Sequence, residues 1–482
     1  MNINFYLMVP EAFLLSAAIF FILFDLVIPH RLKNQVLSSL TLVAIVLTVV
    51  LVVLFTPFVP KEAFNGFVKK DLLVSFSQVL ILVVAFFTTL VSFDYLKKFP
   101  TPYVGEYYYT LLFAVFGLML MVEANELSTL FVSLEVSSIS LYILASLFSG
   151  DYRGKEAALK YFILGSVGAA TIAYGFALLY GITGSTLYPE VASYLKTHLS
   201  DVVLPLLLAL VFIVSGFLFK VGAVPFHGWV PDVYHGAPTP VTLFMGAAVK
   251  VAAFMALLRL FIPVFPLPQP WNGAFIFFAV VTMFAGALMA LNQENLKRML
   301  AYSAISHTGV ILAAAAALPS LALFTVFFYL FAYAFMTVAA FGFISALTGK
   351  GFVGENLSDL KGLYSRNPFM GLLAVVIFMS LAGIPPLLGF WAKFWVLMAL
   401  VKSDYLLVAL SVLVSSLISL YFYLKPIVYI FMKEGEGGAF PGPSELAAVV
   451  VASAVLVVLG LFPSLVSELS LFGLSSFLRG LM

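Results

Sequence analysis

Six ionisable residues stand inside runs of apolar residues, where a charge is costly. Glu135 lies in TLFVSLEVSSIS and His307 lies in AYSAISHTG. The other four are lysines, Lys160, Lys220, Lys250 and Lys393. A lysine at the centre of a bilayer costs about 2.5–3.5 kcal/mol on insertion scales, so packing alone rarely explains it. Such residues are typical of ion and proton pathways.

A proton relay needs groups that change charge near neutral pH. An ammonium group meets this condition when apolar surroundings disfavour its charged form, and a neighbouring carboxylate responds in the opposite sense. A row of Glu, Lys and His at one depth would therefore be a chain of coupled sites, with bridging water held by Ser138, Ser140, Ser303 and Ser306. The competing interpretation is a structural ion pair between Glu135 and Lys220, although buried pairs stabilise poorly. Lys160, near a span end, could instead snorkel to the inner surface.

Composition decides what kind of element must position these residues. Of the 482 residues, 63% are hydrophobic and 10% are charged, against about 45–50% and about 25% in an ordinary globular domain. This excludes a soluble enzyme, and the net charge of +2 is too small to indicate a nucleic-acid partner. There is no cysteine, which excludes disulfides and thiolate-bound metals or clusters. Any redox cofactor of its reaction must then belong to other chains.

Apolar runs of about 20 residues, enough to cross a bilayer as a helix, recur along the chain. They predict fourteen spans, near residues 5–28, 36–57, 72–94, 108–123, 126–148, 156–181, 203–225, 239–261, 272–292, 297–317, 320–348, 368–401, 404–432 and 446–470. With the N-terminus outside, the inside loops hold thirteen Lys and Arg residues and the outside loops hold seven. The positive-inside rule therefore predicts both termini outside.

Two of these spans are interrupted. The seventh contains KVGAVPFHGWVPD and the twelfth contains LAGIPPLLGFWAKF; proline removes a backbone donor and glycine weakens a helix. The breaks lie five spans apart, so spans 4–8 and 9–13 form two five-helix units, and the odd number of crossings inverts one relative to the other. Inverted repeats with broken helices are typical of ion-coupled transporters. We expect an all-α polytopic membrane protein, a single membrane domain with three N-terminal helices (1–107), two repeats (108–261 and 272–432) and a C-terminal helix (446–482).

Several long runs resemble one known family. GFLFKVGAVPFHGWVPDVYHGAPTPVTLFMGAAVK, from Gly216 to Lys250, resembles the antiporter-like membrane subunits of respiratory complex I (NADH–quinone oxidoreductase) and their Mrp-antiporter and hydrogenase relatives. NLKRMLAYSAISHTG agrees, as does LAGIPPLLGFWAKF after Met379 and Ser380. The opening VPEAFLLSAAIFFILFDL, with a lysine at 393, is most similar to the subunit N branch of that family. The resemblance runs from the first span to the thirteenth.

The resemblance implies a role for each of the six residues. Glu135 and Lys220 would be an input pair, Lys160 and Lys250 a connection, Lys393 the output-side lysine and His307 a bridging group. It further implies a proton-translocating subunit of the inner membrane with no cofactor of its own. NADH, FMN, iron–sulfur clusters and quinone would be bound by other subunits, and the partners would be membrane-arm subunits M, L, K, A, J and H. An Mrp-type cation/proton antiporter subunit, a membrane-bound hydrogenase subunit and a non-pumping scaffold stay open as alternatives.

Overall fold

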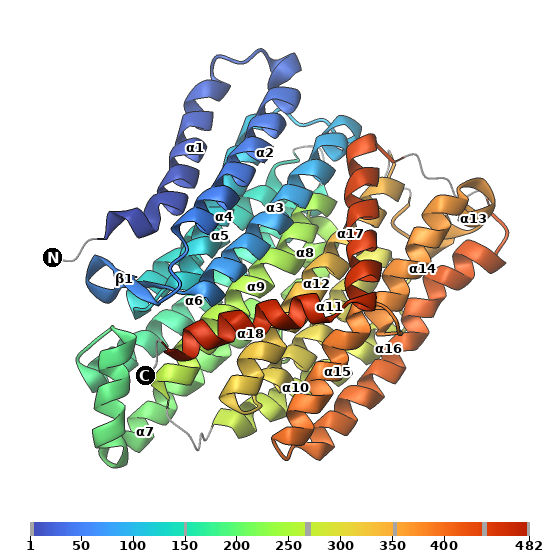
Figure 1. Ribbon diagram of the computed structural model, residues 1–482. Helices are drawn as coiled ribbons and strands as arrows, with labels where there is room; N and C mark the ends of the chain where they lie inside the picture. Colours follow the sequence, from blue (N-terminus) through green and yellow to red (C-terminus); the bar gives the residue numbers. More distant parts are fainter. Residues whose placement is uncertain (1–3, 149–151, 266–270, 350–353, 436–440, 480–482) are drawn as a thin grey trace.

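The computed structural model describes residues 4–148, 152–265, 271–349, 354–435 and 441–479. In this part of the chain, nearly all regular structure is helical, and long helices lie roughly side by side (Figure 1). Twelve helices are long and apolar enough to cross a membrane. The helix α11 (Leu296–Ala315) and the broken pair α14 (Pro368–Ala382) and α15 (Leu388–Lys402) complete the fourteen expected crossings. The chain is therefore an all-α polytopic membrane protein.

The N-terminal part contains three long helices and a small hairpin. Its elements are η1 (Phe5–Met8), α1 (Val9–Asp25), α2 (His30–Phe55), β1 (Lys61–Ala63), η2 (Phe64–Gly66), β2 (Val68–Lys70) and α3 (Leu72–Lys98). The two strands pair antiparallel, with Lys61 opposite Lys70. Because the hairpin folds back towards the bundle, Lys70 becomes buried, which explains its place in a loop that the charge rule assigns to the outside.

The first five-helix unit follows. It comprises α4 (Val104–Glu123), α5 (Leu127–Ser146), α6 (Tyr152–Thr183), α7 (Tyr188–Val221), α8 (Trp229–Gly236) and α9 (Thr239–Val264). Here α7 and α8 are the two halves of the interrupted span. The structure places Arg259 inside α9 and almost completely buried. Arg259 is one of the seven basic residues that the sequence-based count places in outside loops. It lies within α9 instead of in a loop, and Asp71 pairs with it there.

The second unit has the same sequence of long helices. It comprises α10 (Trp271–Ala290), α11, α12 (Pro319–Leu347), the short η4 (Leu357–Leu360) and α13 (Leu363–Arg366), then α14, α15 and α16 (Leu406–Met432). Lys350, counted among the inside basic residues, lies outside the described residues. The helices α9 and α12 are at the centre of the protein, since nearly all of their residues are buried.

Corresponding helices of the two units make the same local contacts. Gly117 of α4 lies so close to α5 that an added Cβ would be 2.7 Å from the nitrogen of Ser137, and Gly286 of α10 lies as close to Ser306 of α11. Glycine and serine are twenty positions apart in both pairs. Isolated β-bridges join Glu126 with Leu187 and Asn295 with Asn356, each pair spanning 61 positions. The two units therefore repeat one arrangement.

The fourth crossing is broken at a similar place in both units. In the first, α7 ends at Val221 and Gly222 adopts a φ of 73°. In the second, α14 ends at Ala382 and Gly383 adopts a φ of 85°. Left-handed values are most favourable for glycine, so each glycine ends its half-helix. The sequence-based expectation of breaks at these positions is confirmed.

The last expected span is two helices. The helix α17 (Pro443–Leu461) crosses the bundle, and α18 (Ser464–Arg479) begins after Pro463. In Figure 1, α18 runs across the bundle at a steep angle to the long helices. The side chain of Ser476 accepts a hydrogen bond from the backbone of Leu72 at 3.3 Å. The fourteenth span therefore ends at Leu461 and not near residue 470.

Candidate functional site

Lys220 lies at the end of the first half-helix, one residue before α7 stops. Its side chain is 8% exposed, and its ammonium donates a hydrogen bond to the hydroxyl oxygen of Ser138 on α5 at 2.8 Å. Glu135 is less than one turn away on α5, but it is half-buried and forms no ion pair with Lys220 in the described structure. The carboxylate oxygen Oε1 of Glu135 is buried without a hydrogen-bond partner. The structure thus brings the expected input pair close together without joining it.

A small cavity lies beside Lys220. It has a volume of about 10 Å³ and its lining includes Ser138, Tyr142 and Trp229. A buried water needs about 10–15 Å³ and two or more polar partners. The cavity therefore offers room for about one water, with the ammonium of Lys220 and the hydroxyl of Ser138 at its wall.

The helix α11 connects the first break with the central lysine. The hydroxyl of Thr308 donates to the carbonyl of Val221, the residue after Lys220, at 3.0 Å. One turn earlier, the carbonyl of Ala304 accepts a short hydrogen bond from the ammonium of Lys250. Lys250 is 4% exposed, and its ammonium lies 4.8 Å from the centre of the Tyr333 ring. A carbonyl and an aromatic face stabilise a cation in place of water.

His307 continues this line, on the same turn of α11 and facing α12 and α16. Its Nδ1 lies 2.6 Å from the hydroxyl of Tyr329, and its Nε2 lies 3.0 Å from the hydroxyl of Tyr423. Tyr423 also forms a short hydrogen bond with Ser303. The imidazole ring centre is 5.0 Å from that of Tyr333. Because each hydroxyl donates and accepts, this buried chain can change the direction of its hydrogen bonds.

Lys393 lies on the second half-helix of the other break. Its ammonium donates to the carbonyls of Leu381 and Ala382, at 3.3 and 2.8 Å. These are the last carbonyls of α14, which carry the partial negative charge of a helix C-terminus. A Cβ on Gly383 would lie 2.8 Å from Cδ of Lys393. The glycine therefore gives both the turn and the space in which Lys393 folds back.

Lys160 lies apart from the other candidates. Its side chain is 42% exposed and pairs with Glu156 at 2.8 Å and with Asp232 at 2.9 Å. Asp232 also accepts from Arg298 at 2.9 Å. This is a partly solvated network at one end of the bundle. The structure does not bring Lys160 into contact with Lys220 or Lys250.

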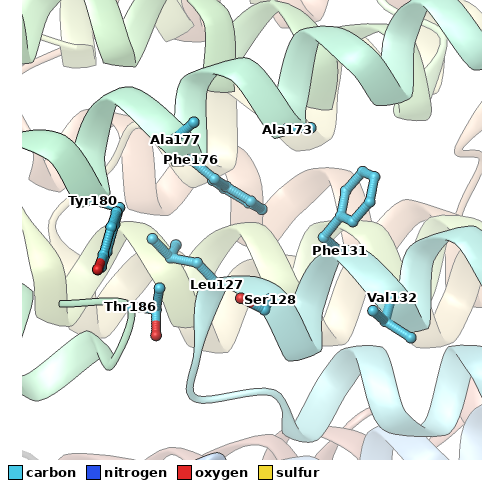
Figure 2. A pocket seen from close by; sticks show the side chains of 9 residues that line it. All are labelled: Leu127, Ser128, Phe131, Val132, Ala173, Phe176, Ala177, Tyr180 and Thr186. Atoms are coloured by element: carbon cyan, nitrogen blue, oxygen red, sulfur yellow. The ribbon is translucent and has the colours of Figure 1, made fainter.

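The pocket in Figure 2 has a different character. It has a volume of about 380 Å³ and is lined by α5, α6 and Thr186. Its side chains are mostly apolar, and Val132 and Tyr180 at its edge are more than half exposed. None of the six candidate residues lines it. Among the described residues, no group of three or more His, Asp or Glu side chains is placed to hold a metal ion.

The comparisons with known proteins agree on one family. The family described as NADH:quinone oxidoreductase/Mrp antiporter, TM, matches residues 124–419. The chain is 38% identical to NADH-quinone oxidoreductase subunit N of Thioalkalivibrio sulfidiphilus, over 97% of this chain and 98% of the relative. The subunit N of Methylovorus glucosotrophus is 36% identical over 98% of each chain. The chain belongs to this family.

The solved structures support the same assignment. A chain of respiratory complex I from Thermus thermophilus matches this chain with a TM-score of 0.80 and 34% identity, over 95% of this chain and 98% of the other. A chain of the Mrp complex from Dietzia matches with a TM-score of 0.85 and 20% identity, over 97% of each chain. The latter shows that the two share a fold. The expected subunit N branch is confirmed.

Sequence reasoning missed the tyrosines of the site. Tyr329 and Tyr333 are one turn apart in TVFFYLFAYAFM of α12, among six phenylalanine and alanine neighbours, and Tyr423 stands in the run SLYFYL of α16. The signal available was the hydroxyl group itself, because a buried tyrosine usually finds a hydrogen-bond partner. Their partner His307 is the only histidine deep in an expected span, and it would have been the residue from which to search.

Proposed function

We propose that this chain translocates protons as an antiporter-like membrane subunit of an NADH–quinone oxidoreductase, using the row Glu135, Lys220, Lys250, His307 and Lys393. The observation that carries the proposal is the set of contacts that α11 makes with the lysines of both units. Within two turns, this helix contacts Val221 beside Lys220 through Thr308, accepts from Lys250 at Ala304, and carries His307, whose ring packs on Tyr333 beside Lys250. Membership of the subunit N family supports the same function.

The electrostatics of the row suggest how a signal would pass along it. Glu135 is half-buried and lies close to Lys220 without pairing to it. A charge that appears or disappears near Glu135 would therefore change the proton affinity of Lys220. Because buried charges interact more strongly than exposed ones, we expect the change to reach Lys250 and then Lys393 through the groups packed around α11. Electron transfer in other subunits would supply the initial change.

The arrangement of this chain within the complex forms part of the proposal. We infer that the two five-helix units, 108–261 and 272–432, are inverted repeats, that both termini lie on the non-cytoplasmic side of the inner membrane and that subunits M, L, K, A, J and H are the partners. We further infer that the chain binds no redox cofactor, since it has no cysteine. A chromophore bound stoichiometrically to this purified subunit would contradict the last inference.

The deciding experiment compares two substitutions of Lys220. Lys220→Ala should leave the complex assembled and should lower quinone reductase turnover and proton pumping together. Lys220→Arg should be nearly as damaging, because arginine does not release its proton in this range. A scaffold predicts the opposite ranking, since arginine would keep the charge.

Lys98 provides a matched control, because it lies outside the row. It is partly buried and pairs with Glu445 at 2.6 Å. Lys98→Arg should keep turnover and pumping, each measured in membranes at equal complex content. Full pumping in the Lys220→Arg variant would exclude a relay role for Lys220.

A further inference from the structure

A second set of buried charged groups lies where α1, β2, α3 and α4 meet. Lys70 of β2 donates two hydrogen bonds to the carboxylate of Glu11, at 2.8 and 2.9 Å, and lies 3.3 Å from Oε2 of Glu123. The side-chain nitrogen of Gln78 donates to both glutamates, at 2.8 and 3.1 Å. All four side chains are at most 3% exposed. None of them belongs to the row described above.

The charges of this cluster do not balance. Two carboxylates face one ammonium. Other charged groups nearby have partners of their own: Asp71 binds Arg259 at 2.6 Å, Lys69 lies 3.8 Å from Glu62, and Glu126 caps α5. If both glutamates were ionised, one negative charge would be buried without compensation, which costs several kcal/mol in such surroundings. A proton on one of the two glutamates removes this charge.

The hydrogen bonds indicate which glutamate carries the proton. Both oxygens of Glu11 accept from Lys70, and one of them also accepts from Gln78. Glu11 therefore makes every contact that an ionised carboxylate requires. In Glu123, Oε2 faces Gln78 and Lys70, whereas Oε1 is buried without any partner. The carbonyl oxygen of Gln78 is also buried without a donor. A proton on Oε1 of Glu123 converts an unsatisfied acceptor into a donor.

A groove lies one layer of residues away from the cluster. It has a volume of about 480 Å³, and its lining includes Met8, Val68 and Leu120. These three residues precede Glu11, Lys70 and Glu123 by two or three positions on the same elements. The neighbouring strand β1 exposes Lys61 and Glu62, so this end of the bundle meets the aqueous phase.

We propose that Glu11, Lys70 and Glu123 form a proton-binding site at the end of the bundle that carries β1, with one proton held on Glu123 and exchanged with water at that face. On release, the O–H bond of Glu123 breaks, the proton passes to water, and Lys70 remains between two carboxylates. The next proton arrives from the interior. Glu135 is the ninth residue of α5, about 14 Å from the start of that helix. The site therefore lies beyond the Glu135 end of the row and is its terminal group at that end. This placement deepens the proposed function and depends on it.

The first test measures the protonation state directly. Infrared spectra of the purified complex near pH 7 are compared for the native protein and Glu123→Gln. We expect the variant to lose the carbonyl band of one carboxylic acid. Loss of a carboxylate signal would show Glu123 to be ionised, and would overturn the proposal. Glu445 is the matched control: it is fully buried, but both of its oxygens accept hydrogen bonds and Lys98 balances its charge. Glu445→Gln should lose a carboxylate signal.

The second test measures pumping in the same variants. Glu123→Gln keeps the shape and neutrality of the protonated acid but cannot exchange its proton, so proton uptake into vesicles should fall about fivefold or more. In Glu445→Gln it should stay unchanged. Full pumping in Glu123→Gln, with the acid band lost, would overturn the role as a terminal group. Failure of the proposed function would be visible separately, as full pumping in Lys220→Arg.

Discussion

Replacing Tyr423 by phenylalanine tests whether the hydroxyl chain around His307 conducts protons. The substitution removes one oxygen that lies 3.0 Å from Nε2 of His307 and bonds to Ser303, and it preserves the ring. Leaving a buried partner unsatisfied costs about 1–3 kcal/mol. If the bond to His307 forms during the limiting proton transfer, this free-energy cost raises the barrier and lowers the rate of pumping by about 5- to 150-fold.

The protein contains a control of the same kind outside the row. Tyr107 is equally buried, and its hydroxyl lies 2.6 Å from that of Ser92. Tyr107→Phe therefore removes one hydroxyl from one buried serine, as Tyr423→Phe does, but it leaves His307 untouched. The two variants should lose similar stability, measured by thermal unfolding of the complex, whereas only Tyr423→Phe should lose pumping.

The assay requires turnover and proton uptake together, in vesicles at equal complex content. Parallel decreases in both quantities would show that the chain is coupled to electron transfer. Equal pumping in Tyr423→Phe and Tyr107→Phe would refute the reasoning, because the hydroxyl of Tyr423 would then be a packing contact only. Tyr329→Phe, which removes the partner of Nδ1, then tests the other side of the imidazole in the same way.

Three further outcomes are expected. Gly383→Ala should lower turnover and cost about 1–3 kcal/mol of stability, because a φ of 85° is strained for alanine and its Cβ would displace Lys393. Gly181→Ala is the control: nothing lies within 4 Å of an added Cβ there, so it should be neutral in the same unfolding and turnover assays. Lys160→Ala should change turnover and stability far less than Lys220→Ala, since exposed ion pairs contribute about 0–1 kcal/mol. A loss of turnover equal to that in Lys220→Ala would place Lys160 in the pathway. Reporter fusions should give an outside signal at Ser200 and an inside signal at Gly349 and Gly435.

The elements of the fold were predictable from sequence where local chemistry decides them. The breaks near Lys220 and Lys393 follow from Gly222, Pro225 and the Pro385–Pro386 pair, because glycine and proline act within one turn. The end of α17 at Leu461 was missed, although Pro463 follows it, because the apolar run continues beyond that proline.

Contacts between distant segments were not predictable. Lys70 meets Glu11 and Glu123, which lie 59 and 53 positions away, only because the hairpin folds back between α1 and α4. In the same way, Ser138 and not Glu135 binds Lys220. Both carry oxygen on one face of α5, three positions apart, and only the packing of α7 against the bundle decides which one is reached.

The two lysines beside the breaks are held by different kinds of acceptor, so they should respond differently to a change of charge nearby. Lys393 donates to two carbonyls at the end of α14, which accept only and favour a positive charge. Lys220 donates to a hydroxyl, which can reverse its hydrogen bond when the amine becomes neutral. If Glu135 supplies the varying charge, the hydrogen bonds of Lys220 can therefore follow it, whereas those of Lys393 rest on fixed dipoles.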